Sequence, residues 1–268
     1  MADVIGARHH SLQRLRRLSR RRSARTDEGA FVLDGPTLLR EALAAGVAVE
    51  EVVAEPGCPE PLLAEAAAAG ATVHHAAEGA LARAVDTVTP HGVAAVARWR
   101  DLPAADALAG AGAVALVLVG VSDPGNAGTL VRSAEAAGAG AVVFCDGSVD
   151  PYGPKCVRSS AGSVLRVALS RAASGADALA ACAAQGRRTV ATVVRAGRSY
   201  DTVDLGGPVA IVLGNEAHGL PPDLAAAVDE AITIPMDGRA ESLNVAMAGT
   251  ILCFEALRQR RAGVDAAP

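Results

Sequence analysis

The chain has 268 residues, about half of them hydrophobic, so it is long enough to bury one or two substantial cores and is not largely disordered. No apolar stretch approaches the roughly 18 residues that span a bilayer, and the N-terminal segment lacks the apolar core of a secretory signal, so we expect a cytoplasmic protein without a membrane partner. The five cysteines are scattered and odd in number, which excludes a disulfide framework and a cysteine-based zinc site.

The formal charge of −4 hides a strongly basic segment at the start of the chain. Clustered arginine releases counterions from nucleic acid, so this segment indicates a basic arm that contacts a phosphate backbone. A solvated helix face or a frayed terminus would show the same charge pattern. The arginines concerned are Arg8, Arg14, Arg16, Arg17, Arg20, Arg21, Arg22 and Arg25.

The first third of the chain alternates short strands and helices. We expect strands at 31–35, 49–55 and 92–99, and helices at 36–46, which opens with proline and closes with glycine, and at 61–70. This pattern predicts a small α/β domain over residues 1–99. Residues 100–112, rich in proline, alanine and glycine, are expected to be a linker.

A second α/β alternation occupies residues 113–268. Its expected strands, at 113–120, 141–147, 188–194, 208–214 and 231–236, are continuously apolar, which is typical of a parallel sheet covered by helices on both faces. Helices are expected from about Asn126, within 150–163, near 174–186 and from about Ser242. Ligand loops are expected at the carboxyl ends of the strands.

Three polar loops follow strands of this second domain. They are "DPGNAGTLVR" after the first strand, "GNEAHG" after residues 208–213, and "PMDGRAESLN" after residues 231–234. Because carboxyl ends of parallel strands share one edge of a sheet, these loops predict a single site. A glycine-rich dinucleotide loop is excluded, since Gly110–Gly112 and Gly138–Gly140 precede strands. His218 has no serine elbow, and the histidines show no metal-ligand spacing, so no metal is expected.

The three loops in this order resemble the motifs of the SpoU/TrmH branch of the SPOUT methyltransferases. These enzymes move a methyl group from S-adenosylmethionine to a ribose 2′-oxygen in RNA. Residues 10–98 are similar to the ribosomal-protein-like RNA-binding domain that many of them carry in front. The resemblance implies an α/β fold with a deep trefoil knot in the SPOUT domain, a homodimer formed through the knot region, and an RNA substrate, most simply 23S-type ribosomal RNA.

The resemblance also implies the site residues. Arg132 would stabilise negative charge developing on the ribose oxygen, or else form a salt bridge to Glu135 or Glu216. Asn126 would position the substrate or merely cap a helix, and Glu216, Ser242 and Asn244 would complete the catalytic set. Cofactor contacts are expected from Leu213, Gly214, Asn215, Gly219, Ile234, Met236 and Leu243. RNA contacts are expected from Arg14, Arg17, Arg21, Arg22, Arg25, Lys155 and Arg158.

Two alternatives remain open on the sequence alone. One is a catalytically silent RNA-binding protein on the same fold, although Arg132, Ser242 and Asn244 together favour an enzyme. The other is a SPOUT enzyme that modifies tRNA or a nucleobase, although the Asn126-x-Gly128-x-x-x-Arg132 form of the first motif favours ribose. Met247, Ile251 and Phe254 recur at helical spacing in the last helix, where they either pack in a dimer or are buried within the monomer.

Overall fold

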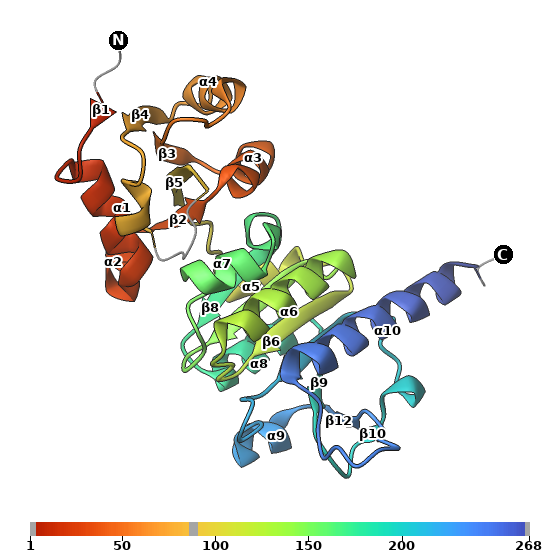
Figure 1. Cartoon of the computed structure of the whole chain (residues 1–268). Helices are drawn as coiled ribbons and strands as arrows, with labels where there is room; N and C mark the ends of the chain where they lie inside the picture. The colour runs from red at the N-terminus through yellow and green to blue at the C-terminus, as the bar shows by residue number, and fades with distance from the viewer. Residues whose placement is uncertain (1–3, 86–90, 266–268) are drawn as a thin grey trace. The chain divides into compact units, whose positions relative to one another are not determined.

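The computed structural model describes residues 4–85 and 91–265, and they form two compact units (Figure 1). The first unit contains the chain up to residue 100 together with residues 152–165, and the second contains residues 101–151 and those from 166 onward. The first boundary between the units falls between residues 100 and 101, and the rest of the segment expected to be a linker belongs to the second unit. Residues 152–165, expected in the second domain, group with the first unit.

The first unit is a five-stranded mixed sheet in the order β1-β4-β3-β5-β2. β5 runs antiparallel to β2 and β3, and the other pairs are parallel. Figure 1 shows α1 and α2 on one side of the sheet and α3 and α4 on the other. The strands are β1 (Val4–Ile5), β2 (Ala30–Asp34), β3 (Val49–Ala54), β4 (Thr72–Ala76) and β5 (Val93–Arg98). The helices are α1 (His10–Arg20), α2 (Arg22–Glu28), α3 (Pro36–Ala44), α4 (Glu60–Ala68), η1 (Leu81–Arg83) and α7 (Pro154–Ser159).

The basic segment at the start of the chain is a folded helix, which corrects the expectation of an arm. Leu12, Leu15 and Leu18 recur along one face of α1 and are buried in the core of the first unit. The arginines occupy the rest of the helix surface, as the amphipathic pattern requires. Deleting α1 would therefore remove part of the apolar core of the first unit as well as positive charge.

Tyr152 packs within the first unit although it lies far along the chain. Its buried ring has its centroid 4.8 Å from that of Phe31 and 5.5 Å from that of Trp99. Its hydroxyl accepts a hydrogen bond from the Arg100 backbone N–H at 3.2 Å. α7 follows directly and contacts β2.

The second unit confirms the predicted α/β class with a parallel sheet. Its seven strands, in the order β10-β12-β9-β11-β6-β7-β8, are all parallel. The strands are β6 (Val114–Leu118), β7 (Ala141–Cys145), β8 (Ala168–Ala172), β9 (Arg188–Thr192), β10 (Arg198–Ser199), β11 (Val209–Leu213) and β12 (Glu230–Thr233). The helices are α5 (Ala104–Ala109), α6 (Pro124–Ala136), α8 (Gly175–Ala184), η3 (Tyr200–Thr202), α9 (Pro222–Ala227) and α10 (Val245–Asp265). The short helix η2 (Ser163–Leu165) belongs to the first unit.

Helices cover both faces of this sheet. Apolar residues of α5, α8 and α9 pack against alternate residues of β6, β7, β9 and β11 in one core. On the other face α6 and α10 lie together, and a Cβ on Gly249 would meet Leu130 of α6 at 2.3 Å and Leu213 of β11 at 2.8 Å. A side chain at position 249 would therefore force the ends of these two leucine side chains to move.

The sequence prediction missed several short elements. The linker contains α5, and β4, β8, β10 and α9 were also absent from the prediction. The last helix begins at Val245 instead of Ser242, because Asn244 caps it. These differences leave the three predicted polar loops at strand ends.

Candidate active site

The site lies where the strand order of the second unit changes direction. From β6 the chain continues to β7 and β8 on one side, and then returns to β9, β11 and β12 on the other. Polar loops at such a switch point, beyond the carboxyl ends of parallel strands, are the usual ligand site of an open α/β sheet. Here the loops follow β6, β11 and β12.

The loop after β11 closes on itself. Asn215 and Gly219 exchange two backbone hydrogen bonds, of 3.0 and 2.9 Å, and the Asn215 amide donates to the Gly120 carbonyl at 2.8 Å. A Cβ at Gly214 would lie 2.4 Å from the Gly219 backbone. Glycine is therefore needed at position 214 so that the loop's own backbone can approach, a role beyond the cofactor contact expected from the sequence.

Glu216 projects from this loop and binds the loop after β6. One carboxylate oxygen accepts hydrogen bonds from the Ser122 N–H at 3.0 Å and the Ser122 hydroxyl at 2.9 Å. The other accepts from the Asp123 N–H and the Asn126 side-chain amide, both at 3.0 Å. Partial burial would raise the pKa of Glu216, but the hydrogen bonds from Asn126, Ser122 and Asp123 outweigh it and lower the pKa from 4.5 to about 2. Glu216 is therefore a carboxylate that fastens two of the loops together.

Asn126 connects this arrangement to the third loop. Its side-chain oxygen accepts a hydrogen bond of 2.9 Å from the Asn244 amide. The Asn244 oxygen accepts from the N–H groups of Ala246 and Met247, so Asn244 caps α10. The cap of α6 is Asp123, whose carboxylate accepts from the Asn126 N–H at 2.9 Å. Asn126 is consequently not the cap, and its side chain links Glu216 to Asn244.

A pocket of about 600 Å³ opens beside these residues. Gly214, Asn215, Gly219, Ile234, Met236 and Leu243 line it, together with Glu216, Ser242 and Asn244. Leu213 does not, because it is fully buried at the end of β11. The sequence analysis missed Thr192, Val193 and Val194, which line the pocket from the end of β9, and Val245 and Ala248 of α10. The signal that could have pointed to the first three is that the strand expected at 188–194 ends at the same edge of the parallel sheet as the polar loops.

The pocket offers both apolar surface and free main-chain groups. Met236 and Leu243 are partly exposed to it. Within the described part of the chain, no backbone hydrogen bond engages the main-chain groups of Ile234, Met236 or Leu243. Apolar walls with a few unpaired donors and acceptors suit a flat heteroaromatic ring with a polar edge.

Residues 113–254 match the SpoU rRNA Methylase family. The chain belongs to this family. The resemblance drawn from the three loops is thus confirmed, and residues 10–95 match the MRM3-like substrate binding domain.

Proteins similar to this SpoU family member along nearly its whole length include a 23S rRNA (guanosine(2553)-2′-O)-methyltransferase, RlmP, of Bacillus subtilis. That protein is 31% identical over 256 residues, covering 95% of this chain and 98% of the relative. The AdoMet-bound rRNA methyltransferase of Sinorhizobium meliloti has 31% identity and a TM-score of 0.86, covering 96% of this chain and 97% of that one. The SpoU methyltransferase AviRb of Streptomyces viridochromogenes, in complex with AdoMet, has 27% identity and a TM-score of 0.84, covering 95% and 100%.

Arg132, the predicted catalytic cation of the SpoU site, lies on α6 and is exposed. The alternative of a salt bridge does not hold, because Glu135 pairs with Arg166 and Glu216 is held by the loop after β6. Arg132 makes no hydrogen bond or ion pair with any residue in the described ranges, and it does not line the pocket. Its guanidinium is free to meet a group supplied from outside.

Two of the predicted RNA-binding arginines are used inside the first unit. Arg14 is bound by three carboxylates, with distances of 2.8 Å to Glu28, 2.6 Å to Glu50 and 2.5 Å to Glu51. Arg25 is buried and donates to the Leu18 carbonyl at 2.6 Å. Sequence alone could not separate them from their exposed neighbours, because their partners come from other elements. We leave both out of the RNA surface proposed below.

The other basic residues remain on the surface. Arg17 is half-exposed and pairs with Glu28 at 2.6 Å. Arg21 and Arg22 are exposed near the junction of α1 and α2, and Lys155 and Arg158 are exposed on α7. No helix among the described residues has the length and apolar character needed to cross a membrane.

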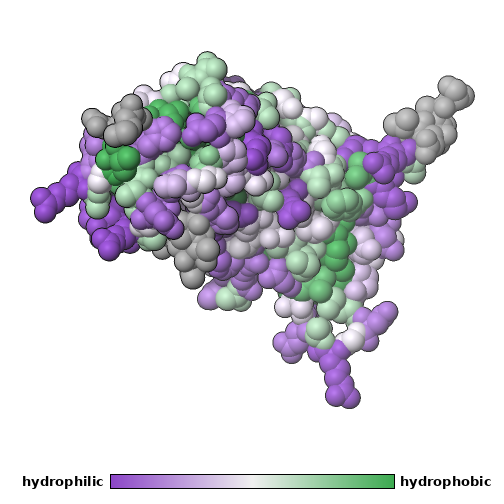
Figure 2. Space-filling view, turned by 45° about the horizontal axis from the view of Figure 1, so that its top comes forward, coloured by the Kyte–Doolittle hydropathy of each residue, from purple (hydrophilic) through white to green (hydrophobic). Residues whose placement is uncertain are grey.

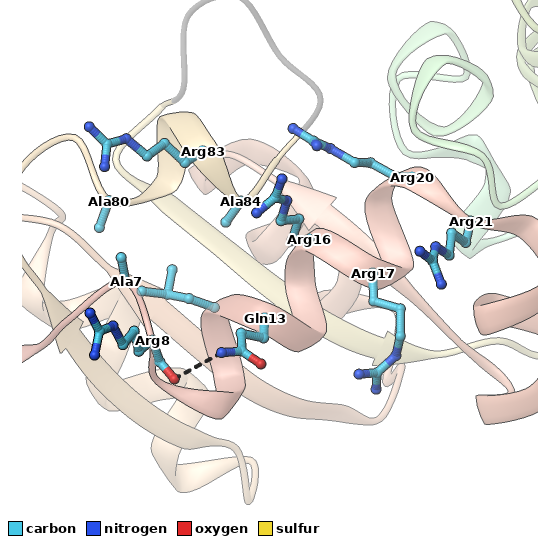
Figure 3. A pocket seen from close by; sticks show the side chains of 11 residues that line it. Ala7, Arg8, Gln13, Arg16, Arg17, Arg20, Arg21, Ala80, Arg83 and Ala84 are labelled. Carbon is cyan, nitrogen blue, oxygen red and sulfur yellow. Dashed lines mark hydrogen bonds between the residues drawn. The ribbon is translucent and has the colours of Figure 1, made fainter.

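An arginine-lined hollow of about 680 Å³ lies along α1 and η1 (Figure 3). Its floor is apolar, with Leu12 of α1 and three alanines that lie just outside the two helices, Ala7, Ala80 and Ala84, and its rim carries Gln13 and six arginines. Within the described residues, five of the six form no ion pair: Arg8, Arg16, Arg20, Arg21 and Arg83. Five of the six arginines belong to the basic segment noted in the sequence, and Arg83 was not predicted. Because η1 brings Arg83 to α1, the structure defines a concave basic surface.

Proposed function

We propose that this protein methylates the 2′-oxygen of a ribose in RNA, with ribosomal RNA as the substrate. The observation that carries the proposal is the chain of hydrogen bonds from Glu216 through Asn126 to Asn244. It joins the three loops that define the family resemblance at the mouth of one pocket. Similar proteins named as 23S rRNA 2′-O-methyltransferases support the choice of ribosomal RNA and of ribose over a base.

The cofactor is S-adenosylmethionine. The pocket has the apolar walls and unpaired main-chain groups that an adenine ring requires, supplied by Ile234, Met236 and Leu243. Similar proteins of known structure carry this cofactor. When bound, S-adenosylmethionine supplies an electrophilic methyl group on its sulfonium.

The chain itself must make a ribose hydroxyl reactive. A hydroxyl is a poor nucleophile at neutral pH, so a group that stabilises developing negative charge on the oxygen accelerates transfer. Arg132 is permanently charged and has no internal partner, which fits electrostatic stabilisation better than proton abstraction. Asn126 and Asn244 would position the ribose, with Glu216 holding Asn126 in place.

The arginine-lined hollow of the first unit is the proposed RNA surface. Arg16 and Arg20 are four residues apart on α1, so they share a face of the helix and can meet successive phosphates. Arg17 and Arg21 repeat the spacing, and Arg22, Lys155 and Arg158 are retained as further contacts. Phosphate contacts of this kind give affinity without sequence reading.

Replacing single arginines tests this surface. Arg16→Gln and Arg20→Gln should each weaken RNA binding and reduce the slope of log affinity against log salt by about 0.7 to 0.9. Arg40→Gln is the matched control, since Arg40 is an exposed arginine on α3. Equal salt slopes for all three variants and the unaltered protein would show that the arginine-lined hollow does not contact RNA phosphates.

We also propose that the C-terminal segment is threaded into a trefoil knot and that the protein is a cytoplasmic homodimer. The dimer is supported by α10, on which Met247 and Phe254 are 52% and 46% exposed and Ile251 is partly exposed. Figure 2 shows a strip of apolar surface on one face of the molecule. These side chains are not buried within the monomer, so a second copy would shield them from water.

The test of the function is methyl transfer from labelled S-adenosylmethionine to purified ribosomal RNA, followed by mapping of the modified nucleotide. The same nucleotide should lack the ribose methyl group in cells without the gene. Transfer to a base or to tRNA would indicate a different SPOUT activity. The absence of transfer to any RNA, with cofactor binding intact, would indicate a silent RNA-binding protein.

A further inference from the structure

Histidines that the sequence scatters over the first unit come together beside a carboxylate. His10 begins α1, His74 lies in β4 and Glu51 lies in β3. One ligand atom from each lies within 4.8 Å of the others. The sequence analysis found no metal-ligand spacing among the histidines, because His10 and His74 are far apart along the chain.

The sheet itself dictates this meeting. β3 and β4 are parallel neighbours, with Glu51 opposite Thr72 and Val53 opposite His74. Side chains two residues apart on a strand point to the same face, so Glu51 and His74 share the face that contains Val53. That face is covered by α1, since Val53 packs in one core with Leu12 and Leu15. The start of α1 therefore carries His10 to Glu51 and His74.

The three groups have the chemistry of a transition-metal site. The Oε1 atom of Glu51 is held by Arg14 at 2.5 Å, whereas its Oε2 atom is buried and makes no hydrogen bond of normal geometry among the described residues, although the Ser11 side chain also interacts with this carboxylate. A buried carboxylate oxygen beside two imidazoles is a donor set that zinc prefers.

A fourth group flanks the set. The ring of His9 lies 4.2 Å from that of His10 and 5.1 Å from that of His74. His9 caps α1 by accepting a hydrogen bond from the Ser11 N–H through Nδ1, at 3.3 Å, which leaves its Nε2 atom unused by the cap.

We propose that His10, His74 and Glu51 bind a divalent transition-metal ion, with Zn²⁺ as the natural occupant. The ion fastens the first turn of α1 to β3 and β4. Since α1 also carries the arginine-lined hollow, the metal stabilises the surface on which those arginines stand. The site is structural and independent of the methyl-transfer pocket, whose lining residues contribute none of its ligands.

The experiment uses the full chain, free of any histidine tag and stripped with EDTA. Zn²⁺ is titrated in competition with a chromophoric chelator, and the thermal midpoint is recorded with and without Zn²⁺. The unaltered protein should bind one equivalent, with a higher midpoint when Zn²⁺ is present. His10→Ala and His74→Gln should each weaken binding by about 100-fold or more and lose the rise, since losing a direct ligand costs more than losing an outer-shell partner.

His75→Ala is the matched control. His75 is the next residue of β4, so its side chain points to the other face of the sheet. This variant should bind Zn²⁺ as the unaltered protein does. His10 is exposed, so His10→Ala should keep the metal-free thermal midpoint, which separates lost binding from lost folding. No binding by the unaltered protein, or equal binding by the unaltered protein and His10→Ala, would overturn the proposal.

Discussion

Glu216→Gln should loosen the fastening between the loops after β6 and β11. The Glu216 carboxylate accepts four hydrogen bonds of 2.9 to 3.0 Å, and glutamine would turn an NH₂ group toward some of those donors. The fall in the pKa of Glu216 from 4.5 to about 2 corresponds to about 3.4 kcal/mol at 1.36 kcal/mol for each pH unit. Because Glu216 is exposed, solvent screening reduces this, and we expect a loss of about 1 kcal/mol in the free energy of unfolding.

The effect of this change should depend on pH. The pKa of Glu216 is lower in the folded protein than in the unfolded chain, so its contribution to stability is complete above about pH 4.5 and is lost as the pH falls toward 2. The difference in unfolding free energy between Glu216→Gln and the unaltered protein should thus be constant near neutral pH and shrink below pH 4.5.

Urea unfolding followed by circular dichroism measures this difference. Glu241→Gln is the control, since Glu241 is an exposed carboxylate that lines the same pocket and accepts no hydrogen bond within the described residues. It should leave the urea midpoint unchanged. If Glu216→Gln were as stable as the unaltered protein at pH 7, or if both variants lost equal stability, the fastening role would be refuted.

The remaining predictions concern chemistry, cofactor and assembly. Arg132→Ala should lower the single-turnover rate of methyl transfer by about 10²-fold while cofactor affinity stays nearly constant, and an unchanged rate at saturating RNA would reassign Arg132 to substrate docking. Gly214→Ala should weaken cofactor binding measured by calorimetry, because its Cβ would lie 2.4 Å from the Gly219 backbone and displace the loop. Unaltered affinity would show that the position of this loop does not affect cofactor binding. Affinity for S-adenosylmethionine should not change with EDTA, and binding lost in EDTA would contradict a metal-free pocket. Sedimentation should give a dimer that Phe254→Glu weakens, whereas a monomer at micromolar concentration would exclude dimerisation through α10.

The sequence predicted the parts of the fold that follow a local rule. Strands such as β6 and β11 are unbroken apolar runs that end at glycine, and their polar loops share an edge because the strands are parallel. β4 and β8 were missed because "TVHHA" and "ALSRA" are short and mix polar with small residues. α5 was missed because alanine after a proline in a region rich in glycine is as typical of a linker as of a helix.

The site could be predicted as a set of loops but not as a set of contacts. Asn126 is hydrogen-bonded to Glu216, 90 positions away in the sequence, and to Asn244, 118 positions away. No local sequence pattern reveals contacts over such separations. The same limit applies to the arginines of α1. Arg14 and Arg16 look alike in the sequence. The fold brings Glu28 of α2 and Glu50 and Glu51 of β3 to Arg14, so Arg14 is an internal ion pair, whereas Arg16 is free of such partners among the described residues.

The membership of residues 152–165 in the first unit affects the order in which the protein can fold during synthesis. Phe31 and Trp99 are made well before Tyr152. Until Tyr152 packs against them, part of the apolar surface of the N-terminal unit is exposed to water. By then β6, β7 and α6 of the other unit have also been made. A fragment ending at residue 100 should therefore be prone to aggregation, and neither unit can be obtained intact by one cut of the chain.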